Sequence, residues 1–503
     1  MIEIQPENKE RNSPPQSLPS QNLNTEAQNL CLKDDVKSIT KVEDIMTQEK
    51  RKGASVLNAT ANIVKSGLGT GILFMPYGFM TCGVVLSTLF MILTGILCYY
   101  CWSILGRIIR QKEAEGGNQG AYKDLTLERV SGLIFGDRIR ILLEVITLIF
   151  IYGTCIGYTI FIQQSISELI SNEIIIQVIV FAIYFPLSLF KRIQNLGIFS
   201  YLALTSFIFT ITVIIIKSCY QIQNSPPVDF VVKIFDIQTL PLYFGVFAFA
   251  YDINGVITEV HASMEDKTKF DIVLRRYLIF SCSLAILIGM LGCFAFGNET
   301  NAVIFKSLGS MKGLGDALSC LYSFSLVASI LLYGFPIVNC LDGLINIHIM
   351  GKSKEDKVNF VFMIFTRCLF FLSISFFGIY IQQITNVFNI LGCVFSVVLI
   401  FIVPMLMFER QRRLKERYVN QLSNAVQINI TPEIKEEKSE KTPQSQINNT
   451  TTTTQNHFSF SQNMSKQKFY FITSINYLVM IFGITGGVSG LVSTIIDIQS
   501  QNS

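Results

Sequence analysis

Long apolar runs recur along most of this chain and constrain its fold more than any other feature. A helix needs about 20 apolar residues to cross the hydrocarbon core of a bilayer, and about eleven stretches meet that length. Hydrophobic residues make up 50% of the chain, too many for an ordinary soluble domain. The sequence therefore predicts an all-α polytopic membrane protein with helices near 56–78, 83–106, 141–169, 174–190, 197–217, 239–260, 278–296, 316–345, 360–379, 384–408 and 469–493.

Basic residues concentrate in every second loop between these spans. Loops on the cytosolic side of a membrane protein hold an excess of Lys and Arg. The basic loops are 107–140, 191–192, 267–276, 352–357 and 410–417, whereas the others hold only Lys217, Lys233, Lys306 and Lys312. This pattern predicts a cytosolic N-terminus and, after the eleventh crossing, a C-terminus outside the cell or in an organelle lumen.

Two polar segments lie beside the apolar spans. Residues 1–52 are rich in Gln, Asn, Ser and Glu, which predicts a disordered cytosolic N-terminal arm. Residues 410–468 end in an Asn- and Thr-rich run, which predicts a disordered cytosolic loop. Residues 53–409 are the expected ten-helix core. An eleventh transmembrane helix at 469–493 and a short outer tail at 494–503 complete the chain.

The first apolar span contains a run of glycines. Gly67, Gly69 and Gly71 alternate in its middle, and Pro76 removes a backbone donor shortly after them. Glycine weakens a helix by about 1 kcal/mol relative to alanine. Two interpretations stand. The segment is unwound at bilayer depth, with amides and carbonyls facing a polar ligand, or Gly67 and Gly71 allow close helix packing through their Gly-x-x-x-Gly spacing.

The sixth span is interrupted near its centre by Asp252, Asn254 and Gly255. A carboxylate at bilayer depth is costly and indicates a functional site by default. If the first ten helices form an inverted repeat, spans one and six correspond, and paired interruptions indicate a transporter's central site. Half-helix amino ends would bind a carboxylate there, and carbonyls of 249–251 would accept bonds from an ammonium group. Asp252 is then a substrate or proton site, or it makes a structural hydrogen bond across the break.

The remaining polar residues have simpler interpretations. Lys65 is expected to make a structural or gating contact, and Glu259 to be a gating contact or a solvated helix end. The 12 cysteines lie mostly in or beside apolar spans, as small core residues do, so no disulfide and no metal site is predicted. No nucleophile–base pair or phosphate-binding loop in the sequence indicates an enzyme. Asn298 begins an Asn-Glu-Thr sequon on an outer loop and is the predicted glycosylation site.

Several motifs resemble the amino acid/auxin permease family, whose members are amino acid transporters with a LeuT-like inverted-repeat fold. Residues 65–73, Lys-Ser-Gly-Leu-Gly-Thr-Gly-Ile-Leu, resemble the family's opening motif. Residues 153–158, Gly-Thr-Cys-Ile-Gly-Tyr, resemble its Gly-x-Cys-x-x-Tyr motif. Residues 249–251, followed by 259–264, resemble the sixth helix of plant-type members. The resemblance covers most of 54–408 and includes the additional eleventh helix.

The resemblance implies a fold of five plus five inverted helices with one extra C-terminal helix, in which helices one and six are discontinuous. It also implies substrate contacts from both breaks, with Tyr158 lining the pocket and the eighth span completing the core. The predicted substrate-binding residues are Ser66, Gly67, Leu68, Gly69, Thr70, Gly71, Tyr158, Phe249, Tyr251, Asp252, Asn254 and Gly255. The predicted ion-coupling residues are Asp252, Ser325 and Ser329.

Three departures from the family pattern bear on ion coupling. Asn62 stands where proton-coupled animal members tend to have His. Asp252 stands where that branch has Glu, and Ile253 where a Gly is common. Ser325 and Ser329 are one helical turn apart, whereas the sodium site of LeuT-like transporters uses adjacent hydroxyls. The last difference favours protons over sodium.

We therefore predict a secondary active transporter of amino acids, coupled to protons, that works by alternating access around the two breaks. An amino acid sensor that binds without net flux, and a sodium-coupled or facilitative carrier, stay open as alternatives. No cofactor is predicted beyond a co-transported proton or sodium ion. The expected partners are an amino acid substrate and the lipid bilayer, with no nucleic acid. Plasma membrane and vacuolar or lysosomal membrane fit the sequence equally, and the oligomeric state is left open.

Overall fold

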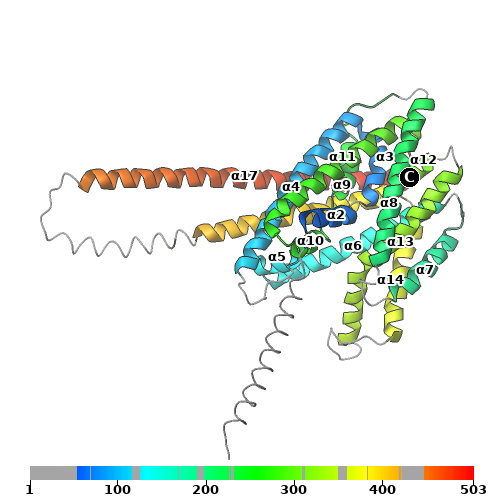
Figure 1. Ribbon diagram of the computed structural model, residues 1–503, viewed down its shortest axis with the longest axis horizontal. Coiled ribbons are helices and arrows are strands. Elements are labelled where there is room, and N and C mark those ends of the chain that lie inside the picture. Colours follow the sequence, from blue (N-terminus) through cyan, green and yellow to red (C-terminus); the bar gives the residue numbers. More distant parts are fainter. Residues whose placement is uncertain are drawn as a thin grey trace, which may run out of the picture. The chain divides into compact units, whose positions relative to one another are not determined.

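The computed structural model describes residues 54–67, 69–115, 125–167, 169–189, 197–225, 227, 231–308, 312–348, 360–381, 383–417, 421 and 447–502. All of them belong to one of two compact units of the chain, Ala54–Ser503. These residues are almost entirely helical and include no strand (Figure 1). The predicted N-terminal arm, 1–52, lies outside the described residues, as does Leu68.

Eight helices in this part of the chain are long and apolar enough to cross a bilayer. Large apolar side chains on their outer faces are exposed, among them Leu89, Ile279 and Leu372 at 57%, 63% and 64%. Such extended apolar surface indicates contact with lipid, so the chain is a polytopic membrane protein. The helices are α4 (Val84–Glu115), α6 (Asp137–Ile166), α8 (Gly197–Asn224), α11 (Phe270–Phe296), α13 (Lys312–His348), α14 (Phe360–Tyr380), the run that starts with α15 (Ile384–Ile390), and α17 (Ile447–Asn502).

The other predicted spans contain shorter helices. The fourth is α7 (Glu173–Ser188); the first consists of α2 (Val56–Gly67), η1 (Thr70–Phe74) and α3 (Met75–Cys82); and the sixth consists of α9 (Leu240–Phe249) and α10 (Ile257–Ser263). Short connecting elements are α5 (Leu127–Phe135), η4 (Lys267–Lys269), η5 (Gly297–Glu299) and α12 (Ile304–Ser307). Spans one and six are therefore interrupted at the glycines and at the polar residues that disfavour a continuous helix.

Local chemistry explains the backbone at each interruption. Gly69 has an extended conformation, with φ −120° and ψ −162°, between α2 and η1. In the sixth span the backbone N–H of Asn254 donates to Asp252 Oδ1 at 2.9 Å. This turn offers the backbone an alternative to helical hydrogen bonds. Close packing occurs as well, because a Cβ on Gly71 would lie 2.9 Å from Ala250 Cα. The glycine run therefore combines an interruption at Gly69 with close packing at Gly71.

Backbone hydrogen bonds join the beginning of α2 to the end of α10. Ala54 N donates to Ser263 O at 2.7 Å, and Glu265 N donates to Ala54 O at 3.2 Å. The two helices pack against each other in Figure 1. The two interrupted spans therefore contact each other twice. The backbone hydrogen bonds of Ala54 join α2 to α10, and Gly71 contacts Ala250 near the centres of the spans.

The tenth span departs from α-helical geometry. α15 continues into the π-helical segment η6 (Leu391–Ile402), after which the chain stays helical to Arg417. Gly392 of η6 lies against the backbone of Gly245 in α9, so closely that a Cβ on Gly392 would clash with the Gly245 carbonyl. π-Helical turns are rare and frequently occur at functional sites.

One asparagine links three of these elements. Asn389 Oδ1 accepts a hydrogen bond from Gly245 N of α9 at 2.7 Å. Its Nδ2 donates to Thr494 Oγ1 of α17 at 2.6 Å. Because Asn389 belongs to α15, it holds α9, α15 and α17 together.

Helix α17 is longer than the last predicted span, 469–493. Its apolar part, Tyr470–Ser500, corresponds to that span. The helix begins at Ile447, inside the predicted loop 410–468, and runs to Asn502, through the predicted outer tail. No proline occurs between these ends to stop the helix.

Candidate functional site

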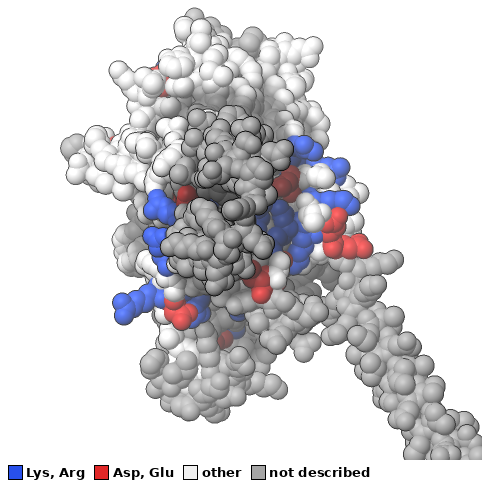
Figure 2. All heavy atoms as spheres, turned by 90° about the vertical axis from the view of Figure 1, so that its left-hand side faces the viewer, with Lys and Arg blue, Asp and Glu red and all other residues white. Residues whose placement is uncertain are grey.

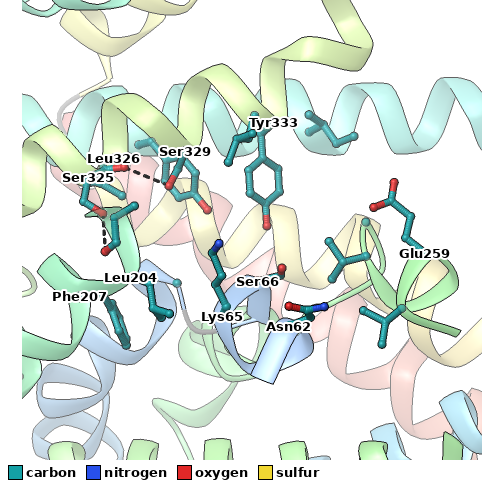
Figure 3. Close-up of a pocket in the computed structure, with 18 of the residues that line it drawn as sticks. Asn62, Lys65, Ser66, Leu204, Phe207, Glu259, Ser325, Leu326, Ser329 and Tyr333 are labelled. Atoms are coloured by element: carbon teal, nitrogen blue, oxygen red, sulfur yellow. Dashed lines mark hydrogen bonds between the residues drawn. The ribbon is translucent and has the colours of Figure 1, made fainter. Parts of the chain in front are cut away.

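A cavity of about 520 Å³ lies beside the interruption of the first span. α2 and α10 form one side of it, and α6, α8 and α13 form the other. Figure 3 shows Lys65 and Ser66 of α2 pointing towards Tyr333 of α13, with Glu259 of α10 at the cavity's far end. This volume is large enough for a small organic ligand.

A second, smaller cavity of about 40 Å³ continues from the first between the two interruptions. Gly67, Gly71, Phe249, Asp252 and Asn254 line this smaller cavity alone. Ser66, Gly69, Tyr158, Gly255 and Tyr333 line both cavities. The smaller one has room for about one water molecule. The breaks of spans one and six therefore lie side by side along two joined cavities.

Asp252 is held by three hydrogen bonds. Its Oδ1 accepts from Asn254 N at 2.9 Å, and its Oδ2 accepts from Asn254 Nδ2 at 3.2 Å. Oδ2 also accepts from Ser396 Oγ of η6 at 2.6 Å. Trp102 Nε1 of α4 donates to Asn254 Oδ1 at 3.4 Å, which fixes the asparagine in turn. Three elements of the fold thus position this carboxyl group.

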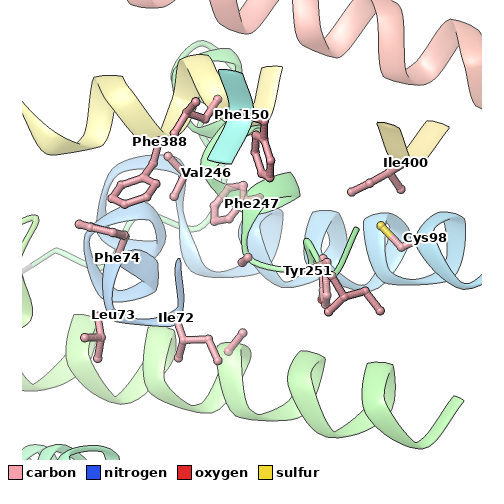
Figure 4. Close-up of a cluster of buried hydrophobic side chains, with 14 of the residues drawn as sticks. Ile72, Leu73, Phe74, Cys98, Phe150, Val246, Phe247, Tyr251, Phe388 and Ile400 are labelled. Carbon is pink, nitrogen blue, oxygen red and sulfur yellow. The ribbon is translucent and has the colours of Figure 1, made fainter. Parts of the chain in front are cut away.

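Aromatic rings close the site on the side of η1 and α9. The ring centroids of Phe74 and Phe388 are 5.2 Å apart, and those of Phe249 and Phe388 are 4.8 Å apart. Figure 4 shows Phe74 and Phe388 within this buried cluster. On the opposite side, Asn62 of α2 and Glu259 of α10 are exposed. The large cavity therefore lies on the α2 and α10 side of the aromatic cluster.

The predicted ion-coupling residues do not share one cavity. Ser325 and Ser329 line the larger cavity, whereas Asp252 lines only the smaller one. Their hydroxyls donate to backbone carbonyls, Ser325 to Ala203 O at 3.1 Å and Ser329 to Ser325 O at 3.2 Å. The physical reason is that α13 turns these serines towards α8 and the wide cavity. The structure instead brings Ser396 to Asp252.

Two predicted substrate-binding residues line neither cavity. Tyr251 is fully buried, its hydroxyl donates to Met91 O of α4 at 2.9 Å, and its own carbonyl accepts from Tyr277 at 3.4 Å. Thr70 is fully buried in η1. Neighbouring residues of an unwound chain point to different sides, so residues adjacent in sequence to cavity residues need not line the cavity. The predicted gating residues Lys65 and Glu259 do line the larger cavity.

Sequence reasoning missed Ser396, Trp102 and Tyr333. Ser396 is the only hydroxyl residue in the apolar segment Leu391–Ile402, which was an available signal. Trp102 is the only tryptophan of the chain, but nothing in the sequence relates it to Asn254. Tyr333 is one of 18 tyrosines and has no distinguishing pattern.

Several charged side chains outside the cavities form ion pairs. Figure 2 shows Lys and Arg side chains, together with Asp and Glu, across the middle of one face. Ion pairs join α4 to η4 and to the beginning of α11: Lys267 Nζ of η4 is 2.6 Å from Glu113 Oε1, and Arg110 Nη2 is 3.9 Å from Asp271 Oδ2. These residues belong to two of the basic loops. Asn298 is exposed just after α11. In the part of the chain that the structure describes, no cluster of His, Cys, Asp and Glu could hold a metal ion.

Comparison with known proteins identifies the class. A sequence profile described as transmembrane amino acid transporter protein matches residues 52–431. The chain therefore belongs to this family, the amino acid/auxin permeases, whose members are transporters and not enzymes.

Individual relatives are distant. Vacuolar amino acid transporter 4 of Saccharomyces cerevisiae is 25% identical over 292 residues, which cover 56% of this chain and 39% of that protein. Amino acid transporter AVT3C of Arabidopsis thaliana is 24% identical over 302 residues, covering 54% and 68%. The proton-coupled amino acid transporter-like protein pathetic of Drosophila melanogaster is 23% identical over 370 residues, covering 68% and 76%. The matched region thus spans well under half of the yeast protein.

Proposed function

We propose that this chain is a secondary active transporter that moves amino acids across a membrane by alternating access. The observation on which this proposal rests is the pair of joined cavities at the interruptions of spans one and six, where Asp252 and Asn254 line the smaller cavity. Interrupted helices in corresponding positions form the central sites of transporters with inverted repeats. We accordingly assign the core to a LeuT-like fold of ten helices, at 53–409, with an eleventh helix added. Family membership and the names of the relatives support an amino acid as the substrate.

The substrate binds where the two cavities join. The interruptions supply the contacts to its carboxylate and ammonium groups, and its side chain extends into the larger cavity. The residues we assign to binding are Ser66, Gly67, Gly69, Gly71, Tyr158, Phe249, Asn254 and Gly255. Lys65 and Glu259 gate the path from the larger cavity to the cytosol.

Coupling is to protons through Asp252. Two of the three groups that contact its carboxyl are N–H donors from Asn254. Such donors have no lone pair to offer a cation, and hard cations take oxygen ligands. A proton, by contrast, binds to the carboxyl group of Asp252 without any further ligand. Sodium-coupled and facilitative transport are the alternatives.

Orientation follows from the basic loops. With the N-terminus in the cytosol, α2 and α10 lie on the cytosolic half, and the cavity beside them corresponds to an inward-facing state. Two relatives are named vacuolar, which favours a vacuolar or lysosomal membrane over the plasma membrane. A glycan at Asn298, on the opposite side, is consistent with this orientation.

Uptake by purified protein in proteoliposomes tests the proposal. We expect net accumulation of a radiolabelled amino acid when a proton gradient is imposed, and none beyond equilibration when only a sodium gradient is imposed. Saturable binding without any uptake would instead identify an amino acid sensor. Uptake driven by sodium alone would refute proton coupling while preserving the transporter assignment.

A further inference from the structure

We propose that Ser396 is a positioning residue for Asp252 and that it sets the pH range in which transport is coupled to protons. The inference rests on the proposed proton-coupled transport and adds to it a residue from the tenth span. Ser396 Oγ donates to Asp252 Oδ2 at 2.6 Å, and the serine is fully buried. This bond joins η6 directly to the interruption of the sixth span.

The hydroxyl group suits both protonation states of the carboxyl group. A hydrogen bond donated to a carboxylate favours its ionised form. A hydroxyl also has lone pairs, so Ser396 can rotate and accept a bond from a protonated Asp252. The two N–H contacts from Asn254 can only donate. Ser396 is therefore the contact that adapts to either state.

The backbone around Ser396 prevents it from moving away. Gly392 of η6 packs against the Gly245 backbone of α9, the helix that leads to Asp252. On the other side of η6, a Cβ on Gly490 of α17 would clash with Cys393 Sγ. The serine and the carboxyl group are thus carried by elements in close contact. Separating them requires η6 to leave both α9 and α17.

No competing group is expected to titrate beside Asp252 near neutral pH. The groups that interact with it electrostatically are Cys98 of α4, Tyr277 of α11 and Tyr333 of α13. Tyr158 of α6 lines the same cavity. Thiol and phenol groups have ordinary pKa values of about 8.5 and about 10, so they stay neutral between about pH 5 and pH 7. Lys65 of α2 and Glu259 of α10 line the larger cavity and not the smaller one, and Cys393 of η6 faces α17.

The test is the pH profile of uptake by the full-length protein in proteoliposomes. Ser396→Ala should move the pH of half-maximal uptake upwards by about one unit, since a hydrogen bond to a charged group is lost. Ser396→Thr keeps the hydroxyl group, so uptake by this variant should have the wild-type pH profile. Ser131→Ala is the matched control, because this buried serine donates to Leu127 O at 2.8 Å on α5, away from the cavities. Its profile should not move.

The outcomes separate the two proposals. A wild-type protein whose uptake ignores pH would overturn proton coupling, and this inference with it. A pH-dependent wild type whose profile Ser396→Ala leaves in place would overturn the inference alone. If Ser396→Ala protein does not fold, Ser396→Cys is used, because a thiol is a weaker donor of similar size. That variant should shift the profile in the same direction by a smaller amount, and an unmoved profile refutes the inference.

Discussion

The glycines of the two interruptions have different neighbours. A Cβ on Gly67 would clash with Tyr277 of α11, and one on Gly71 would lie 2.9 Å from Ala250 Cα. By contrast, a Cβ on Gly69 would lie 3.8 Å from Tyr158 Oη, and one on Gly255 would have no heavy atom within 4 Å. Gly67 and Gly71 are therefore needed for packing, whereas the space beside Gly69 belongs to the cavity.

Replacing Gly69 by valine should abolish uptake without unfolding the protein. The Cβ fits at 3.8 Å from Tyr158 Oη, but the two methyl groups beyond it would occupy the junction of the cavities. We expect at least about a tenfold loss of uptake, equivalent to about 1.4 kcal/mol of lost binding, and an unchanged melting temperature. Gly313→Ala is the control, because its Cβ would also have no heavy atom within 4 Å and the residue lines neither cavity, so uptake should stay within about twofold. Normal transport by Gly69→Val would show that this glycine serves only helix packing.

Asp252→Asn should flatten the pH profile of uptake. The amide has nearly the same shape as the carboxyl group but cannot exchange a proton at any physiological pH. Substrate binding should persist, measured by displacement of a labelled amino acid, while the driving effect of a proton gradient disappears. If this variant kept the wild-type profile, Asp252 would have no part in coupling.

At the scale of helices, the sequence reveals the interruptions but not the π-helical segment. Gly69, Asp252 and Asn254 disfavour a helix locally, so their effect can be read from neighbouring residues alone. η6 is uniformly apolar apart from Cys393 and Ser396, and its geometry comes with the contact between Gly392 and Gly245, residues far apart in the chain. For the same reason, the sequence could not show that Ser325 and Asp252 line different cavities. The rotation of each helix decides which cavity its side chains enter.

Docking of α17 depends on small residues facing α9. A Cβ on Gly486 would overlap the ring of Phe244, which is 3% exposed. Gly486→Ala should therefore cost about 1–3 kcal/mol, as overpacking of a core does, and lower the melting temperature of the detergent-solubilised protein. Ser489→Ala, on the exposed side of the same helix, is the control and should have no effect. Equal melting temperatures for both variants would contradict this docking.

At the scale of the whole transporter unit, the two sides of the site differ. Phe74, Phe249 and Phe388 close the side of η1 and α9, and the wide cavity lies beside α2 and α10. The sequence predicts where the site is, because the interruptions are local. It cannot predict which side is open, because the open side depends on how α2 and α10 lie against α6 and α13, which are far from them in the chain. In the orientation that we propose from the basic loops, the open side faces the cytosol.

Thiol labelling tests this asymmetry and the orientation together. Asn62 is exposed and lines the large cavity, whereas Thr70 is fully buried beyond the interruption. In a background where Cys31 of the N-terminal arm and the exposed Cys219 and Cys320 are replaced by alanine, Asn62→Cys should react with a membrane-impermeant maleimide in inside-out vesicles only. Thr70→Cys should react far more slowly from either side.

Labelling of Asn62→Cys in right-side-out vesicles alone would reverse the orientation. No labelling from either side would mean that α2 and α10 do not border an open cavity, so access from the cytosol would need a further movement of α10 away from α13.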